Sequence, residues 1–280
     1  MTTTTERPVP DPVSPEPFFS RRPVVAPLET AGKIMQFGVR VITEIPAAIG
    51  LYPSEVVRQT GRLLKSSAVI IWMMMFVIGA EVGLQGHYLL DQIGAASYIG
   101  VFNALGDIRP DAAMMWGWIF AAKVSCGYVA EIGSMRISEE IDALEVMGIR
   151  PISYLAGSRV LAAWIASPFI FFFGIAMEFL GSWLISQVML DTVSPGGYSD
   201  VFWSFQTPAD IMSALTWSMI GGTIIVIVGC YFGYTASGGP VGVGNNTAKS
   251  MMVNMIVVSM VGLVLYQFFF NTQPVVPIGN

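Results

Sequence analysis

Residues 131–151 read EIGSMRISEEIDALEVMGIRP and form a polar segment with its own helical pattern between long apolar runs. Ser138 is a favourable N-cap, and the two acids that follow it lie in the first turn, where the helix dipole favours negative charge. Gly148 can close the helix, and Pro151 stops it. The segment therefore predicts a short, self-contained helix over about residues 138–147.

One narrow face of this predicted helix is apolar. Ile137, Ile141 and Leu144 recur at helical spacing, while the acidic side chains point elsewhere. A rigid helix of this kind between two membrane spans can fit a cleft on a soluble motor protein and pass its movement to the spans. A structural loop with solubilising acids fits the same spacing equally well.

The composition identifies an integral membrane protein. Of 280 residues, 54% are hydrophobic and only 12% are charged, against roughly 25% charged residues in ordinary soluble domains. The net charge of −5 argues against a nucleic-acid partner, because neutralising phosphates needs a basic surface. No paired-carboxylate, Cys/His or Ser/His arrangement predicts catalysis, so we expect a chain that is not an enzyme and binds no metal or cofactor.

Five apolar runs are long enough to cross the roughly 30 Å of bilayer hydrocarbon, which takes about 20 helical residues. They are Ser67–Leu90, Ala112–Ala130, Val160–Leu190, Ile211–Tyr234 and Met251–Phe270. The predicted fold is therefore all-α: a five-span domain over residues 66–272, with the short polar helix between the second and third spans.

The segments that flank this domain have a different character. Residues 1–28 are rich in proline and predict a disordered tail, and residues 273–280 form a short second tail. Between the first tail and the five-span domain, apolar side chains alternate with basic ones over residues 29–65, which is typical of an amphipathic helix lying in the membrane interface. A cytoplasmic helix packed on protein is the alternative.

Basic residues set the orientation. Twelve of the fourteen Lys and Arg residues lie on one side of the predicted spans, and the opposite side has only Arg109. By the positive-inside rule the N-terminus and residues 131–151 are cytoplasmic, and with five spans the C-terminus is extracytoplasmic.

Several motifs match a known family in order and spacing. They are Ala130-Glu131-Ile132-Gly133, Met135-Arg136, Glu139–Leu144, Met147-Gly148, Ser158-Arg159, Gly83-Leu84-Gln85-Gly86, Ala104–Pro110 and Gly233-Tyr234. At these residues the chain resembles the MlaE/YrbE family, the permease subunits of MCE-type lipid ABC transporters. Its proline-rich tail is similar to that of the actinobacterial, including mycobacterial, YrbE branch. The chain departs from the family at Glu140, where many relatives have Gln, and at Gly106–Arg109.

The resemblance implies a permease core in the inner membrane, formed with a second YrbE-like permease that is either a copy of this chain or a paralogue. It also implies a cytoplasmic ABC ATPase dimer that carries the ATP and Mg, MCE-domain proteins on the outer side, and a lipid path between protomers. The polar helix then becomes the ATPase-coupling element. Its implied coupling residues are Glu131, Arg136, Ser138, Glu139, Glu140, Ile141, Asp142, Leu144, Glu145 and Met147.

Polar residues near the outer ends of the first two spans are candidates for the lipid cavity. These are Glu81, Gln85, His87, Asp107 and Arg109. For Glu81, a structural ion pair with Lys123 is an equally good explanation, because a charge at mid-membrane needs a partner.

The predicted function is thus lipid import driven by ATP, with a fatty acid, a mycolic-type lipid or a sterol as cargo; a phospholipid also suits an apolar cavity. An ion-coupled secondary carrier and a non-transporting scaffold for MCE proteins are the alternatives. The first would need buried titratable residues and, usually, duplicated spans.

Overall fold

The structure is a computed structural model that describes residues 25–191 and 193–270. The predicted N-terminal tail lies outside these residues up to residue 24, and the tail at residues 273–280 lies outside them entirely. Every regular element of the described chain is a helix, which confirms the all-α prediction.

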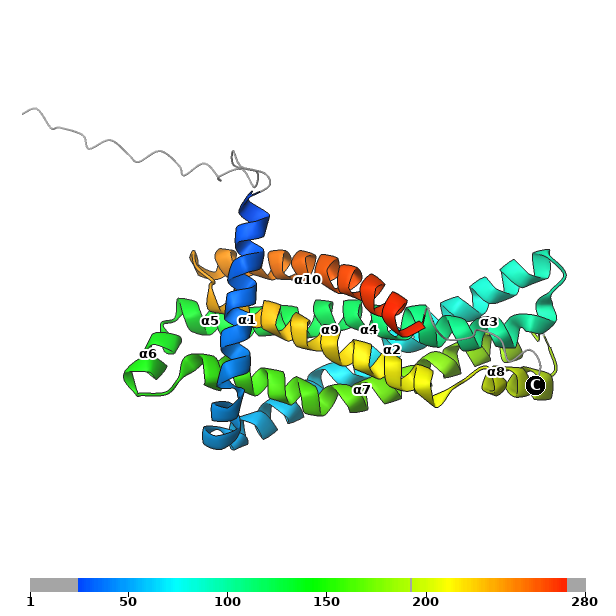
Figure 1. Cartoon of the computed structure of the whole chain (residues 1–280), viewed down its shortest axis with the longest axis horizontal. Coiled ribbons are helices and arrows are strands. Elements are labelled where there is room, and N and C mark those ends of the chain that lie inside the picture. Colours follow the sequence, from blue (N-terminus) through cyan, green and yellow to red (C-terminus); the bar gives the residue numbers. More distant parts are fainter. Residues whose placement is uncertain (1–24, 192, 271–280) are drawn as a thin grey trace, which may run out of the picture.

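In chain order the helices are α1 (Val25–Leu51), α2 (Pro53–Gln92), η1 (Ala96–Tyr98), α3 (Ile99–Gly106), η2 (Asp107–Ala112), α4 (Ala113–Phe120), η3 (Ala121–Ser125), α5 (Cys126–Ile137), α6 (Glu140–Val146), η4 (Ile152–Gly157), α7 (Ser158–Trp183), η5 (Leu184–Met189), α8 (Pro195–Ser204), α9 (Pro208–Tyr234) and α10 (Gly239–Phe270). Apart from α1, the long helices run side by side in a bundle together with α4 and α5; α6 lies at one end of it, and α3 and α8 lie at the other (Figure 1).

Five helical stretches in the described residues are long and apolar enough to cross a membrane. They are Leu28–Leu51, Pro53–Gln92, Ile152–Met189, Pro208–Tyr234 and Gly239–Phe270. The last four contain the predicted first, fourth and fifth spans and all but Leu190 of the predicted third span. The first lies in α1, where the sequence predicts an interfacial helix instead.

The predicted second span, Ala112–Ala130, is not one continuous α-helix. It is divided among α4, η3 and α5, and the wider π-helical turns of η2 and η3 interrupt the regular pattern. Pro110 lies in η2, and its missing N–H prevents a regular helical hydrogen bond there. The segment still runs along the bundle (Figure 1), with the stacked rings of Trp116 and Phe120, 4.4 Å apart, completely buried.

The predicted interfacial segment, residues 29–65, is not one helix, because the helix is interrupted at Tyr52. This residue leaves helical geometry, with a φ of −129°, and Pro53 then begins α2 at a position where its fixed φ suits a helix start. Residues 53–65 therefore belong to the same helix as the first span. Figure 1 shows α1 crossing the bundle near the end that carries α6, whereas the other long helices run along it. That α1 lies in the membrane interface stays a prediction.

Two helices, α2 and α7, pack backbone against backbone. A Cβ atom added at Gly79 would overlap the carbonyl oxygen of Glu178, and one added at Gly181 would overlap the carbonyl oxygen of Phe76. Such close approach is how helices associate in lipid, where contact between backbones replaces the hydrophobic effect as the driving force. Glycine at these positions therefore fixes the spacing of α2 and α7.

Polar contacts join α10 to the middle of the bundle. The Asn254 amide donates to the Ser125 hydroxyl at 2.8 Å, and the hydroxyls of Ser125 and Ser250 are 3.0 Å apart. The Trp118 indole donates to the Ser259 hydroxyl at 3.1 Å. Ser125, Ser250 and Asn254 are completely buried, so their contacts, together with that of Trp118, fix how α10 lies along η3 and α4.

Replacing Gly79 with Ala should destabilise the protein by about 1–3 kcal/mol, the usual cost of overpacking, because backbone rather than a flexible side chain occupies the space. The midpoint of thermal unfolding in detergent measures this. Gly127→Ala is the matched control: nothing lies within 4 Å of its added Cβ, so stability should stay unchanged or rise. Equal midpoints for both variants would contradict the close packing.

Candidate functional site

The site that the sequence singled out, α6, lies at one end of the bundle beyond the end of α5 (Figure 1). The prediction that Ser138 is its N-cap is wrong. Ser138 instead ends α5, and its hydroxyl donates to the carbonyl oxygen of Ser134 at 2.9 Å. Glu139 follows in the left-handed region, with a φ of 60°, and turns the chain into α6.

The predicted end of α6 at Gly148 is confirmed. Its φ of +76° is one that glycine adopts without steric cost. The N–H of Gly148 donates to the Glu145 carbonyl at 2.9 Å, and the N–H of Ile149 donates to the Leu144 carbonyl at 3.0 Å. These two bonds form a Schellman motif, which satisfies the last carbonyls of a short helix.

Three contacts anchor α6 to the rest of the protein. Ile141 is completely buried, and Leu144 packs half-buried against the main core. Arg136 of α5 forms an ion pair with Asp142 at 2.6 Å, and the same guanidinium lies 5.9 Å from the centre of the Tyr234 ring of α9. The helix is therefore held against the core and against the end of α5, which itself contacts α9.

The opposite side of α6 is open and combines acids with apolar side chains. Glu139, Glu140 and Glu145 are exposed. Val146 is 90% exposed and Met147 is 66% exposed. The predicted coupling residues include Met147 but not Val146. The available signal was that Val146 lies away from the apolar face formed by Ile141 and Leu144, which predicts that it is exposed. The neighbouring side chains of Val146 and Met147 give the open side of α6 an exposed apolar surface.

Glu131 of α5, another predicted coupling residue, lies about two turns before Ser138 and joins three helices. Its carboxylate forms an ion pair with Arg159 of α7 at 3.0 Å and a second one with Arg62 of α2. The side chain is only one-third exposed, so it links α5, α2 and α7 rather than projecting outward. Neither arginine was predicted from the sequence to be a partner of Glu131.

The environment of Arg159 explains why this pair is stable although Arg159 is 1% exposed. Its guanidinium donates to the Leu155 carbonyl at 2.8 Å and lies 5.4 Å from the centre of the Tyr128 ring. Burial favours the neutral form of Glu131, but Arg159 and then Arg62 outweigh it and lower the pKa of this carboxyl. Its ion pairs therefore stabilise the fold at neutral pH, and that contribution is lost only as the pH falls through the lowered pKa.

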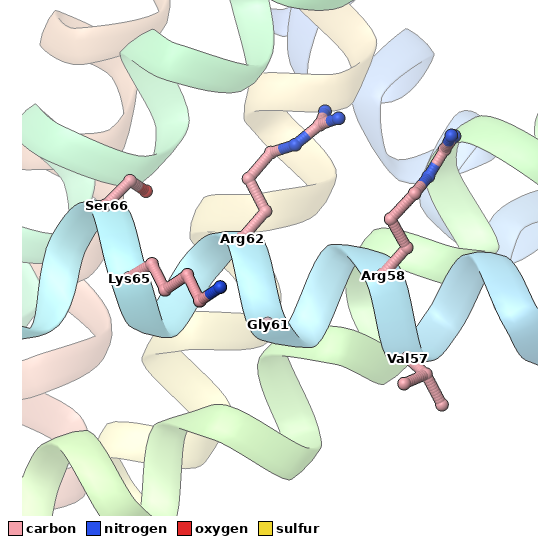
Figure 2. Close-up of a pocket in the computed structure, with 6 residues that line it drawn as sticks. All are labelled: Val57, Arg58, Gly61, Arg62, Lys65 and Ser66. Atoms are coloured by element: carbon pink, nitrogen blue, oxygen red, sulfur yellow. The ribbon is translucent and has the colours of Figure 1, made fainter.

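A shallow hollow on α2 carries three cations beside this junction. Figure 2 shows Arg58 and Arg62 extending from one side of α2, with Lys65 lying along it. Arg58 is paired with Glu55, whereas Lys65 forms no ion pair among the described residues. This end of α2 is therefore a basic surface, as the positive-inside rule expects of a cytoplasmic end.

The predicted lipid-cavity residues divide into an exposed group and a buried group. Glu81 and Gln85 are exposed on α2, where the amide donates to the carboxylate at 3.0 Å. His87 is half-buried on the same helix, with its ring 5.4 Å from that of Tyr88. No ion pair of the described residues joins Glu81 to Lys123.

Asp107 and Arg109 lie inside the protomer rather than on its surface. The Ser182 hydroxyl of α7 donates to Asp107 at 2.7 Å, and Asp107 is completely buried. Arg109 pairs with Asp210 of α9 at 3.2 Å and lies 5.7 Å from the Phe270 ring. These two residues thus connect η2 to α7, α9 and α10. The described residues contain no group of three His, Cys, Asp or Glu that could hold a metal ion.

Residues 56–268, which run from α2 almost to the end of α10, match the family described as Permease MlaE. The chain belongs to the MlaE permease family. This permease is therefore a multi-pass membrane transport protein, and the part matched includes α6 and the Glu131 junction.

Named relatives cover most of the permease. A "probable ABC transporter permease protein" of Rickettsia prowazekii is 30% identical over 221 residues, which are 79% of this chain and 85% of the relative. One of the same description from Rickettsia bellii is 29% identical over 243 residues, 87% and 93% of the two chains. The chloroplastic protein TRIGALACTOSYLDIACYLGLYCEROL 1 of Arabidopsis thaliana is 30% identical over 211 residues, which are 74% of this chain and 59% of the relative.

Replacing Arg159 with Met should destabilise the permease by about 2 kcal/mol, measured by thermal unfolding in detergent. Breaking a fully buried pair costs roughly 3–5 kcal/mol, and the effect is smaller here because Arg62 still faces the carboxylate.

Lys65→Met is the matched control for Arg159→Met, because it removes an exposed cation that forms no ion pair in the described chain. Its effect should stay within about 0.5 kcal/mol. In the double variant with Glu131→Gln, the loss caused by Arg159→Met should shrink. An unchanged loss would show that Arg159 acts through packing instead of charge.

Proposed function

We propose that this permease is the membrane subunit of an ATP-driven lipid transporter whose ATP is hydrolysed by a separate ABC ATPase. The observation that carries the proposal is the two-sided build of α6. One side is fixed to the bundle through Ile141 and the Arg136–Asp142 pair, and the other leaves Val146 and Met147 exposed. A helix built this way can receive a force from a partner and deliver it to the spans.

The docking step rests on the chemistry of the open side of α6. Val146 and Met147 offer apolar contact area, and the flanking acids Glu140 and Glu145 give this surface a negative rim. A complementary partner has an apolar cleft bordered by basic residues, since apolar contacts supply binding energy and charges set orientation. We assign this cleft to the ATPase.

The transmission step follows the ion pairs. Because Asp142 is paired with Arg136, a displacement of α6 also displaces the end of α5. Glu131 lies on the same helix and joins it to α2 through Arg62 and to α7 through Arg159. Rigid helices joined by such contacts move as bodies, so ATP-driven closure of the motor reaches both α2 and α7.

The cargo step concerns the surfaces that α2 and α7 turn away from the core. Met73 and Val77 of α2 and Phe169 and Phe173 of α7 are exposed apolar side chains in the described chain. We propose that a second permease, a copy or a paralogue, packs against this protomer to enclose a lipid path, and that MCE-domain proteins receive or deliver lipid outside. A fatty acid, mycolic-type lipid or sterol fits such a path, and we propose import in the inner membrane, with the N-terminus cytoplasmic.

Val146→Arg should abolish copurification of the ATPase and leave the unfolding midpoint of the permease unchanged, because a side chain that is 90% exposed contributes little to the fold. Ile93→Arg is the matched control. It places the same charge on a residue that is 70% exposed at the far end of α2, and the ATPase should stay bound. An ATPase retained by Val146→Arg would disprove the docking surface.

Reconstituted vesicles distinguish the proposed function from its alternatives. We expect lipid transfer that requires both ATP and the ATPase. Transfer driven by an ion gradient without ATP would identify a secondary carrier, and the absence of any transfer by an intact complex would identify a scaffold.

A further inference from the structure

Glu178 is a buried carboxyl group to which the proposed transport mechanism gives no role. It lies in α7, a membrane-spanning helix, and is completely buried. Neither of its carboxyl oxygens has a hydrogen-bond partner among the described residues. The backbone of α2 at Gly79 packs against the backbone of Glu178, and with no exposed surface the carboxyl group is enclosed by protein and not exposed to lipid.

The charged groups that face Glu178 are acids. Asp107 and Asp111 of η2 act on it electrostatically, and α2 contributes Glu81, whose charge acts on Asp111. Arg109, the cation of η2, forms an ion pair with Asp210 of α9. No described Lys or Arg forms an ion pair with Glu178 or Asp107.

Glu178 and Asp107 have different local partners. Asp107 accepts a hydrogen bond from Ser182, which stabilises its charged form, while its other carboxyl oxygen has no partner in the described chain. Glu178 has no donor on either oxygen. Two neighbouring carboxyl groups cannot both be ionised cheaply in a region without water, and the one that lacks a donor takes the proton.

We propose that Glu178 is a proton-binding site inside the membrane domain, occupied when α7 is packed against α2 and η2. The ligand is a proton: the described residues contain no group of three such side chains that could hold a metal ion. If α7 separates from η2 and water enters, the proton passes from the Glu178 carboxyl to that water and leaves a carboxylate. The new negative charge is repelled by Asp107, so closing the helices again requires a proton to return.

Infrared spectroscopy of the full chain in detergent tests the site directly. At neutral pH the spectrum should contain a carboxylic acid C=O band that Glu178→Gln removes. Glu55→Gln is the matched control, because Glu55 is also buried but is paired with Arg58 and accepts from Gln59 at 2.7 Å. That variant should slightly weaken the carboxylate bands, to which the other acids of the chain still contribute, and leave the acid band unchanged.

A second variant assigns the proton and remains informative if Glu178→Gln does not fold. In Asp107→Asn the acid band should persist, because Glu178 still holds its proton. Loss of the band in Asp107→Asn would place the proton on Asp107 and overturn the proposal. A wild-type spectrum at neutral pH with carboxylate bands and no acid band would overturn it as well.

Discussion

One carboxylate, that of Glu131, connects three helices near the end of the bundle that carries α6. In a chain with so few charges, a charged side chain near the apolar core must find a partner, and both partners of Glu131 come from elsewhere in the sequence. Arg159 is held so completely by α7 and Tyr128 that it cannot swing away to solvent. The position of α5 relative to α2 and α7 therefore depends on this junction.

The rest of this end of the bundle is built outward from that junction. Beyond Glu131, Ser138 caps the end of α5, and Arg136 holds α6 against the bundle through Asp142. The turn at Gly148 then leads the chain back toward η4 and α7. The short helix α6 and the long helices are thus joined by short, directional contacts. At the other end, glycine contacts hold α2 and α7 too close for independent movement.

Most of the helices could be predicted because a membrane span needs only length and apolar composition, and both are properties of one segment. The end of α6 was also predictable, since a positive φ after a helix favours Gly148. Ser138 was misassigned because a serine suits both a helix start and the end of the preceding helix, and the backbone of Glu139 decides between them. The π-helical turns in the second span escaped a pattern that assumes regular helix.

The partners in the candidate site could not be predicted, because they meet only after folding. Arg159 lies 28 positions after Glu131, and Asp210 lies 101 positions after Arg109. The role of Val146 depends on which side of α6 faces the bundle, and Ile141 settles that only in three dimensions. Glu178 lies in an apolar run of the sequence, but its lack of a hydrogen-bond donor among the described residues is a property of the packed helices.

The most direct test of the proposed coupling is Glu131→Gln in a reconstituted complex of the permease with its ATPase, with ATP hydrolysis and lipid transfer measured together. The substitution removes the charge that joins α5 to α2 and α7 and leaves the open side of α6 intact. We predict that the ATPase stays bound and hydrolyses ATP while lipid transfer is lost. Lipid transfer per ATP at the wild-type level would contradict the transmission of movement through Glu131.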